Sequence, residues 1–529
     1  MGLVIKYNKH HGTAFTIKWL KACHLAVQRK LSSRPCRSLR DIEPNLPCPR
    51  LINGLPVFIG TMDRKAIRQG HAPTIRLWLT ILSVYRILKG PLNPKLETIT
   101  KPFAGCSEEL SKVLEVSRLV YSHNEDLFSS LKSIRVDEIA KLLTAGPNNP
   151  VSIQGLLTDA IALIKNPNIL DLFRSYLIKT KSILFLKQFD RRIEMIKEMI
   201  ETKGSSWVKL PKSMSYEDIR LGKLSFKEEA AGKLRVFAIA DAWTQSLFKP
   251  LHKSLFDILR RLPNDGTFDQ DSSFQRCLQK AQLYNCAYSV DLSSATDRLP
   301  IVLQSGIIDI LYQIPELGSI WAKILVDRPY VISKNKYKIP VGAVHYATGQ
   351  PMGALSSWAM LAVTHHFILQ VSALRVYPEY NSWYDRYEIL GDDLVIFDTI
   401  VYQEYLRIMN LLDVGTNPSK SLFSEGVTAI EFAKRTGVNG MDVSGISWKQ
   451  FISALSLSDR IGLLIHFIGK GLVPTIPIIF SIIGTGNDHL TLNSLSRNEK
   501  GESILNRSLM ALLGHFVNSN KMSLVDAVA

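Results

Sequence analysis

Cysteine is scarce in this chain, and the few cysteines follow no ordered spacing. The 529 residues form no Cys-x-x-Cys pair and no spacing typical of a zinc site. Disulfide frameworks belong mainly to short secreted chains, so we expect reduced thiols here. These observations argue against a disulfide scaffold or a zinc ribbon. The six cysteines are Cys23, Cys36, Cys48, Cys106, Cys277 and Cys286.

Long hydrophobic runs are also missing. The longest apolar stretch, residues 472–483, is interrupted by Pro474 and Pro477. It is shorter than the roughly 20 apolar residues that a membrane-spanning helix needs. No secretory signal is evident, so we expect no stable membrane span.

Acidic residues are absent from the first 40 positions, which carry nine Lys or Arg residues. The first 100 residues hold 17 Lys or Arg against 4 Asp or Glu, so 13 of the 17 net positive charges lie there. Such a balance favours a polyanionic partner, and nucleic acid in particular. The basic start has the composition of a transit peptide, but it also fits an arm that contacts RNA. Both interpretations stay open.

The remaining composition is that of a large globular protein, with 46% hydrophobic and 21% charged residues. Helical spacing dominates before position 220, strands and helices mix in the middle, and the last hundred residues look helical and apolar. We expect a basic arm and Pro/Gly-rich linker over residues 1–54, a helix-rich region over 55–280, a mixed region over 281–450 with an insertion at 301–345, and a helical end over 451–529.

Two short apolar runs flank Gly391, Asp392 and Asp393 in the sequence YEILGDDLVIFD, residues 387–398. Their β-branched content predicts two strands joined by a tight turn. Adjacent carboxylates raise each other's pKa, so the arrangement is unfavourable without a cation. Mg²⁺ prefers oxygen ligands and usually takes one or two carboxylates together with substrate phosphates.

A second carboxylate, Asp291, ends another predicted strand. Nucleotidyl transfer needs two divalent ions, one at the attacking 3′-oxygen and one at the triphosphate, and carboxylates on neighbouring strands can hold both. It also needs cations for the triphosphate. Lys227, Lys233 and Arg235 surround a predicted Gly turn and are candidates for that role. Taken alone, they are better explained as a solvated surface.

Several segments resemble the motifs of viral RNA-dependent RNA polymerases, specifically those of mitoviruses and the wider narnavirus-like group. DLSSATD (291–297), the segment that starts GQPMGALSS (349–357) and ILGDDLVIF (389–397) resemble motifs A, B and C. KEEAAGKLRVFAI (227–239) resembles motif F, NPSKS (417–421) motif D, and EFAKR (431–435) the motif that follows it. The resemblance covers about residues 55 to 450.

This resemblance implies roles for individual residues. Asp291, Asp392 and Asp393 would hold two Mg²⁺ ions, or Mn²⁺ in their place. Asp297 would recognise the ribose 2′-hydroxyl, with Ser356 or Ser357. Gly349 and Gly353 would let a loop pass close to template and nucleotide, and Lys420 would act as a proton donor to pyrophosphate. His365 and His366 are interpreted as packing residues, and Asp385 and Asp398 as solvated.

The implied fold is α+β: a right-hand polymerase with an antiparallel palm sheet, helix-rich fingers and a helical thumb. The implied partners are an RNA template and product and ribonucleoside triphosphates, with the chain acting as a monomer. The implied location is the host mitochondrion, or the cytosol if the chain is narnavirus-like. A reverse transcriptase or maturase and a catalytically inactive RNA-binding relic are the alternatives. Asp297, and Gly391 before the paired aspartates, argue against the former, since those enzymes usually carry aromatic residues there.

Overall fold

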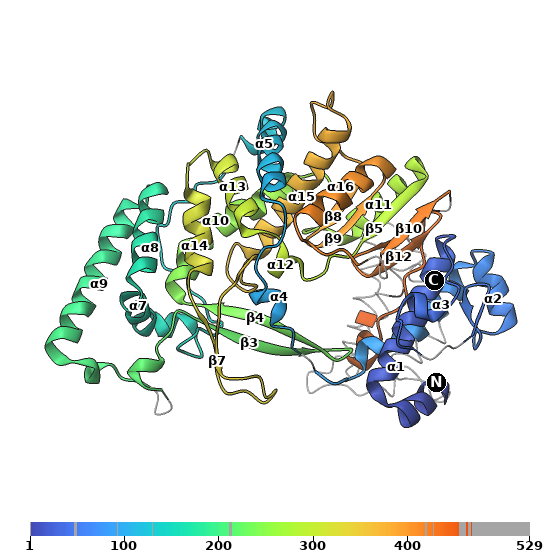
Figure 1. Ribbon diagram of the computed structural model, residues 1–529, viewed down its shortest axis with the longest axis horizontal. Coiled ribbons are helices and arrows are strands. Elements are labelled where there is room, and N and C mark those ends of the chain that lie inside the picture. The colour runs from blue at the N-terminus through green and yellow to red at the C-terminus, as the bar shows by residue number, and fades with distance from the viewer. Residues whose placement is uncertain are drawn as a thin grey trace, which may run out of the picture.

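The computed structural model describes most of the chain up to position 453. The described residues are 2–46, 50–92, 94–129, 131–210, 214–417, 421–426 and 428–453, together with 462, 463 and 467. Figure 1 shows an elongated molecule with α7, α8 and α9 at one end and the N-terminal elements at the other.

α-Helices account for about half of the described chain. They are α1 (Gly2–Leu31), α2 (Thr61–Arg68), α3 (Ala72–Leu82), α4 (Glu97–Thr100), α5 (Ser107–His123), α6 (Glu125–Phe128), α7 (Leu156–Ile164), α8 (Pro167–Lys179), α9 (Ile183–Lys203), α10 (Ala242–Arg261), α11 (Gln270–Tyr284), α12 (Ala295–Arg298), α13 (Ile301–Tyr312), α14 (Leu317–Val326), α15 (Ser357–Val376), α16 (Thr399–Leu411) and α17 (Trp448–Ser453). Short 3₁₀ turns add η1 (Leu39–Asp41), η2 (Ser83–Ile87), η3 (Ser152–Gly155), η4 (Ser205–Trp207) and η5 (Tyr216–Asp218).

The strands form small, mostly antiparallel sheets. They are β1 (Leu51–Ile52), β2 (Leu55–Pro56), β3 (Gly222–Glu229), β4 (Lys233–Ala240), β5 (Cys286–Val290), β6 (Tyr330–Ile332), β7 (Gly342–Val344), β8 (Tyr387–Leu390), β9 (Asp393–Ile396), β10 (Leu422–Glu425), β11 (Ala429–Phe432), β12 (Arg435–Val438) and β13 (Met441–Asp442). The two predicted hairpins are confirmed, since β8 pairs with β9 and β3 with β4, both antiparallel.

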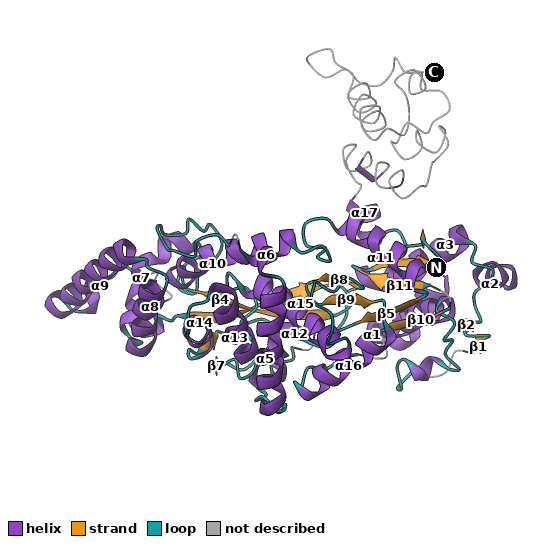
Figure 2. Ribbon diagram, turned by 90° about the horizontal axis from the view of Figure 1, so that it is seen from above, coloured by secondary structure: helices purple, strands orange, loops and turns teal. Residues whose placement is uncertain are grey.

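The central sheet has the order β10-β5-β9-β8, so strands far apart in sequence lie side by side. Alternating side chains point to opposite faces of a strand. Val290 and Leu394 therefore join one buried cluster with α15 and α16, whereas Ala287 and Val395 join another with α11 and β11. Figure 2 shows these strands between the two layers.

Helix α15 is the one element in the described chain that is long and apolar enough to cross a membrane. Most of it is buried within this protein, where it packs against α5, α10 and α16. A core helix of a globular protein has the same composition, because it too is apolar on every side.

A second sheet, β4-β3-β6-β7, lies below the central one in Figure 1. Its strands β6 and β7 come from residues 301–345, and α14 from the same segment packs on α8. At the tip of the β3–β4 hairpin, the Ala231 amide donates a hydrogen bond to the Leu88 carbonyl at 2.8 Å. This contact joins the hairpin to the N-terminal part of the chain.

The described residues among the first 54 are folded, which differs from the arm and linker expected there. Trp19 and Cys23 of α1 are at most 1% exposed, and Leu39 of the expected linker and Leu55 just after it are fully buried in the same cluster. Pro44 lies in a short turn, and Gly54 lies in the turn between β1 and β2. Burial of the apolar side chains of this segment stabilises its fold, and a composition typical of a linker does not reveal that burial.

Candidate active site

Asp291 and Asp393 lie directly opposite each other at the edge of the central sheet. Ser289 pairs with Val395 and Val290 with Leu394, so the next position along β5 and β9 brings Asp291 beside Asp393. Opposed residues of an antiparallel pair share a face, with Cβ atoms about 4.5–5.5 Å apart. Asp392 follows in the exposed turn between β8 and β9. The sheet therefore brings together the three aspartates that the sequence predicted.

The charges of these carboxylates act on one another. Burial, followed by the charges of Asp392 and Asp291, raises the pKa of Asp393 to about 6, while Lys434 opposes the shift. Like charges held this close favour protonation or a bound cation.

The carboxylates suit Mg²⁺ by their chemistry. Within the described ranges, no group of three His, Cys, Asp or Glu side chains is placed to hold an ion unaided. Mg²⁺ usually keeps waters and takes one or two carboxylates plus substrate phosphates, so a full protein cage is not required. The facing pair Asp291 and Asp393, with mutual repulsion, fits that mode.

Glu431 is a fourth carboxylate at this site, and no role was predicted for it from the sequence. Its amide donates a 2.9 Å hydrogen bond to the Ser289 hydroxyl, which fixes β11 against β5. Burial raises the pKa of Glu431 to about 7; Arg86 opposes this shift, and Asp393 and Asp291 add to it. The sequence feature that could have indicated a role for Glu431 is an acidic residue within the apolar run Ala-Ile-Glu-Phe.

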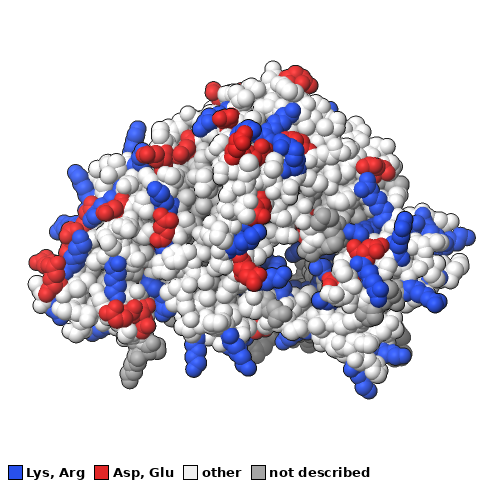
Figure 3. Space-filling model, viewed as in Figure 1, with Lys and Arg blue, Asp and Glu red and all other residues white. Residues whose placement is uncertain are grey.

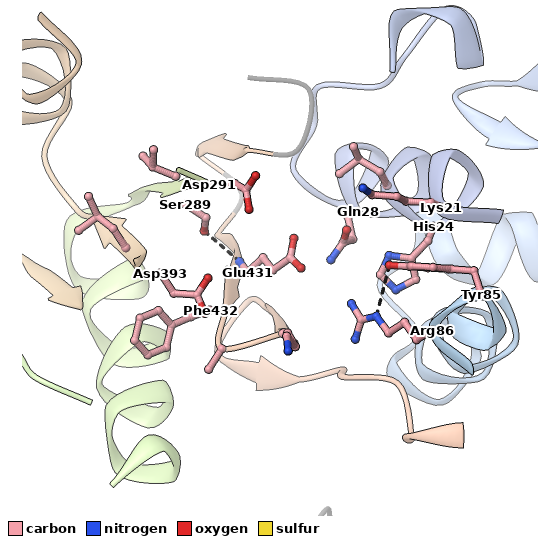
Figure 4. A pocket seen from close by; sticks show the side chains of 15 residues that line it. Lys21, His24, Gln28, Tyr85, Arg86, Ser289, Asp291, Asp393, Glu431 and Phe432 are labelled. Carbon is pink, nitrogen blue, oxygen red and sulfur yellow. Dashed lines mark hydrogen bonds between the residues drawn. The ribbon is translucent and has the colours of Figure 1, made fainter. Parts of the chain in front are cut away.

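A cavity opens beside these carboxylates, and its far wall comes from the N-terminal region. Asp291, Asp393 and Glu431 line one side, while α1 and η2 line the other (Figure 4). The residues from α1 and η2 are Lys21, His24, Leu25, Gln28, Tyr85 and Arg86. The sequence showed the positive charge of this region but not that it reaches the carboxylates.

Asp297 lies on α12, after the end of β5. Its carboxylate accepts a 2.7 Å hydrogen bond from the Thr98 hydroxyl, and burial raises its pKa against the opposing influence of Thr98 and Arg298. Gly349 packs on the same segment: an added Cβ would lie 2.3 Å from the Thr296 carbonyl oxygen. Glycine is required there for the close approach of two backbones.

Gly353 has an equivalent constraint on the other side of its loop. An added Cβ would lie 2.4 Å from the Ala238 carbonyl oxygen of β4, and φ is +113°. The Ala238 amide also donates to the Met352 carbonyl at 2.7 Å. The loop of residues 349–353 is thus fixed between α12 and β4 by protein contacts.

The two candidate serines are both buried at the start of α15. The Ser356 hydroxyl accepts a 2.9 Å hydrogen bond from the Trp321 indole, and its amide donates to His252 at 3.1 Å. The Ser357 carbonyl accepts from Gln350 at 2.8 Å. Ser356 is therefore already oriented by a buried partner.

The predicted cations of the β3–β4 hairpin are exposed. Arg235 pairs with Glu229 at 2.7 Å, and Lys233 lies 3.9 Å from the same carboxylate. Lys227 lies opposite Arg235 in the strand register. On the face shown in Figure 3, Lys and Arg side chains gather around the hollow between this hairpin and the N-terminal elements.

Lys420 lies outside the described residues. The flanking chain is held at Asp291: the Asn417 amide donates to the Asp291 carbonyl at 2.8 Å, and the Asp291 amide donates to the Ser421 hydroxyl at 3.3 Å. Of the expected helical end, α17 and residues 462, 463 and 467 are described, and the remaining positions lie outside.

The interpretation of Asp398 as solvated is wrong, whereas the histidines are packing residues as expected. Asp398 is 7% exposed and caps α16 by accepting hydrogen bonds from the Ile400 and Val401 amides. His365 is buried and contacts the Gly391 carbonyl and the Tyr405 hydroxyl, both at 2.8 Å. It thus supports the turn that carries Asp392.

Comparison with known proteins identifies relatives for most of the chain. The family model described as mitovirus RNA-dependent RNA polymerase matches residues 130–500. The RNA-directed RNA polymerase of Cryphonectria parasitica mitovirus 1 is 35% identical over 459 residues, which cover 83% of this chain and 52% of that protein. This chain therefore spans about half the length of that relative.

Two further similarities are more limited. An uncharacterized mitochondrial protein of Arabidopsis thaliana is 34% identical over 205 residues, covering 38% of this chain and 78% of that one. The crystal structure of the RNA-dependent RNA polymerase of a human picorbirnavirus aligns with a TM-score of 0.38 at 13% identity, covering 57% of this chain and 60% of that one. Since the family model spans well over half of the sequence, the chain belongs to the mitovirus RNA-dependent RNA polymerase family.

Proposed function

We propose that this chain is an RNA-directed RNA polymerase that copies a viral RNA genome from ribonucleoside triphosphates. The observation that carries the proposal is the facing pair Asp291 and Asp393 on β5 and β9, with Asp392 in the adjoining turn. Carboxylates gathered on one sheet edge are what two-metal nucleotidyl transfer requires. Membership of the mitovirus polymerase family supports the same activity.

In this proposal the central sheet with α15 and α16 is the palm. The helices before it, together with the β3–β4 sheet and the inserted residues 301–345, form the fingers, and residues 451–529 form the thumb. The order of the described elements supports the first two parts of this assignment, because helices come first and the mixed sheet region follows.

Asp291, Asp392 and Asp393 would hold two Mg²⁺ ions, and Mn²⁺ could replace them. When bound, such ions would activate the 3′-oxygen of the growing strand and neutralise the triphosphate. The protein's own contribution is rigid placement: β5 and β9 hold two carboxylates in register, and His365 supports the turn behind Asp392.

The other roles in this proposal come from the motif resemblance, and contacts in the structure support them. Asp297, next to the metal site and held by Thr98, would accept a hydrogen bond from the ribose 2′-hydroxyl, with Ser356 or Ser357 nearby. Lys227, Lys233 and Arg235 would bind the triphosphate, with Gly349 and Gly353 fixing the loop between them and Asp297. Lys420, between two residues bonded to the Asp291 backbone, would protonate the leaving pyrophosphate.

The partners in this proposal are an RNA template, the RNA product and ribonucleotides, with the polymerase acting as a monomer. The location would be the host mitochondrion. Similarity to a mitovirus polymerase and to mitochondrial proteins of Arabidopsis thaliana supports this location over the cytosol.

Asp392→Asn tests the activity directly. Primer extension with Mg²⁺ should fall by about 10³-fold or more, because one anionic ligand of a charge-stabilised transition state is lost. RNA affinity should stay within about twofold, since the basic surfaces are unchanged. Asp385→Asn is the matched control: it makes the same chemical change at an exposed residue just before β8 and should extend normally.

The result separates the alternatives. Extension by Asp392→Asn at the wild-type rate would reject the catalytic assignment. A wild-type protein that binds RNA but never extends it would identify an inactive relic. Extension with deoxynucleotides in preference to ribonucleotides would identify a reverse transcriptase.

A further inference from the structure

The cavity at the carboxylates has walls of opposite charge. Asp291, Asp393 and Glu431 line the sheet side, whereas Lys21 and Arg86 lie on the N-terminal side (Figure 4). These cations come from residues more than 200 positions earlier in the chain than Asp291. The fold thus completes the site with a wall that the sequence motifs do not contain.

The N-terminal wall is held by a folded core. Residues of α1 next to Lys21, including Cys23 and Ala26, are fully buried, and the cluster extends to Val84 and Tyr85 of η2. The Arg86 guanidinium lies 5.7 Å from the Tyr85 ring centre, and its Nε donates to the Tyr85 hydroxyl at 3.3 Å. Arg86 is therefore a positioned group on a rigid wall.

The charge of the wall at neutral pH comes from Arg86 and Lys21. Burial, and then the charge of Arg86, lowers the pKa of His24 to about 3, so this histidine is neutral. Arg86 acts electrostatically on both His24 and Glu431, which places its charge next to the carboxylates. Lys434 of the β11–β12 turn adds a third cation to the lining.

A ligand that fits both walls needs two groups a short distance apart. One is an anionic group that binds the cations of the N-terminal wall. The other is an oxygen that a metal ion can bridge to the carboxylates. The 3′-terminal part of an RNA strand has this form, with a phosphodiester next to a free 3′-hydroxyl. The planar guanidinium of Arg86 matches phosphate geometry in a bidentate manner, and lysine supplies an additional point charge.

The position of the cavity distinguishes the growing strand from the incoming nucleotide. Asp297, the 349–353 loop and β4 are joined to one another by the Gly349 and Met352 contacts. None of them lines the cavity that holds Arg86, which is bounded on the sheet side by β11. If the nucleotide binds on the side of the carboxylates near Asp297, as proposed above, the side near Arg86 remains for the RNA strand whose 3′-hydroxyl attacks the nucleotide.

We propose that α1 and η2 form a phosphate-binding wall for the 3′ end of the growing RNA strand, with Arg86 as its main ligand and Lys21 beside it. The assignment of the strand rests on the proposed polymerase function. It gives the N-terminal basic region a defined position in the reaction: it holds the strand whose 3′-hydroxyl is extended.

Primers with one uncharged linkage test this contact. A methylphosphonate replaces the first, second or third phosphodiester from the 3′ end of a primer annealed to template, and the full chain is titrated by fluorescence anisotropy without Mg²⁺. Wild-type protein should lose about tenfold in affinity at one of these linkages, the effect of a charge-assisted hydrogen bond. Arg86→Ala should bind the unmodified primer about tenfold more weakly and lose nothing more at that linkage.

Two variants control for folding and for general charge. Lys18→Ala removes an exposed cation of the same helix, paired with Glu43 at 3.5 Å, and should show the wild-type pattern. Lys21→Ala, at an exposed position, should weaken the same linkage contact even if Arg86→Ala proves unstable by thermal unfolding.

Two outcomes would contradict the proposed phosphate-binding wall. In one, the methylphosphonate at each linkage lowers the primer affinity of Arg86→Ala and of Lys21→Ala as much as it lowers that of the wild type. In the other, Arg86→Ala raises the KM for nucleotides with RNA affinity unchanged, which would assign Arg86 to the triphosphate. Failure of the wild type to extend RNA would reject the polymerase activity separately, because the binding data need no turnover.

Discussion

Two antiparallel hairpins carry the charged groups of the proposed reaction, and they differ in burial. The β8–β9 hairpin is almost entirely buried, with Ile389, Val395 and Ile396 at 0% exposure. The β3–β4 hairpin exposes Lys227, Lys233 and Arg235 to water. Charges on the exposed hairpin cost little because water solvates them, whereas charges on the buried hairpin must be compensated.

The buried hairpin carries two carboxylates, Glu388 and Asp393, whose charged surroundings differ. Glu388 of β8 is fully buried, and it pairs with Arg276 at 2.8 Å and Lys280 at 2.9 Å. The charged groups that act most strongly on Asp393 of β9 are Asp392 and Asp291. The fold therefore neutralises Glu388 by ion pairs, whereas the charges around Asp393 favour a bound cation, as the proposed metal site requires.

The largest expected effect concerns the turn of the buried hairpin. Gly391 has φ +63°, and an added Cβ would lie 3.1 Å from the Trp358 ring. Gly391→Ala should lower the free energy of unfolding by about 2–3 kcal/mol, of which about 1–2 kcal/mol is left-handed backbone strain. Urea unfolding measures this, and extension should fall as Asp392 shifts.

Gly70→Ala is the matched control for that prediction. Gly70, in the turn after α2, has a similar φ of +77°, but nothing lies within 4 Å of an added Cβ. It should cost the backbone strain alone, about 1–2 kcal/mol, with normal extension. Equal losses for the two variants would show that contact with Trp358 is unimportant.

Removing the cations of the exposed hairpin should act on substrate binding and not on stability. Lys233→Ala with Arg235→Ala should raise the KM for nucleotides about tenfold, since two charges next to a triphosphate are lost. Steady-state extension kinetics measure this. Lys336→Ala removes an exposed cation of the same sheet region, paired with Glu228 at 2.7 Å, and should leave KM unchanged. A KM that rises equally in both would point to a general charge effect.

The raised pKa of Asp393 predicts a pH dependence of the metal-free protein. Its carboxyl titrates near 6 when folded, above the value of about 4 for an unfolded aspartate. The folded state therefore holds the extra proton between these values, so this group's contribution to stability is present at low pH and is lost as pH rises through about 6. The stability difference between wild type and Asp393→Asn should change across pH 4–6, and Mg²⁺ should stabilise the wild type more at pH 7 than at pH 5. A difference that stays constant over this range would contradict the shift.

The smallest effect is expected at Asp297 of α12, whose segment contacts the 349–353 loop that packs on β4. Asp297→Ala should reduce the preference for ATP over dATP in kcat/KM by about tenfold, the loss of one hydrogen bond to the 2′-hydroxyl. Thr98→Val removes the hydroxyl that orients this carboxylate at 2.7 Å and should show a weaker form of the same change. An unchanged ratio in Asp297→Ala would leave this residue with a structural role at α12.

Local pattern was sufficient to predict the elements of the site. The alternating apolar runs around Gly391 and Gly232 gave two hairpins, and the strand before Asp291 was also correct, because side-chain periodicity and turn residues act over a few positions. The motifs of the family resemblance indicated which of these elements would meet.

The tertiary structure decided what faces the carboxylates. Strand pairing brought Asp291 opposite Asp393, β11 brought Glu431 beside them, and the N-terminal core brought Arg86 across the cavity. The N-terminal segment looked like a free basic arm because its composition is basic, yet 12 of the 30 residues of α1 are buried. Composition records the average charge of a segment, whereas the position of each charge depends on long-range packing that no local pattern contains.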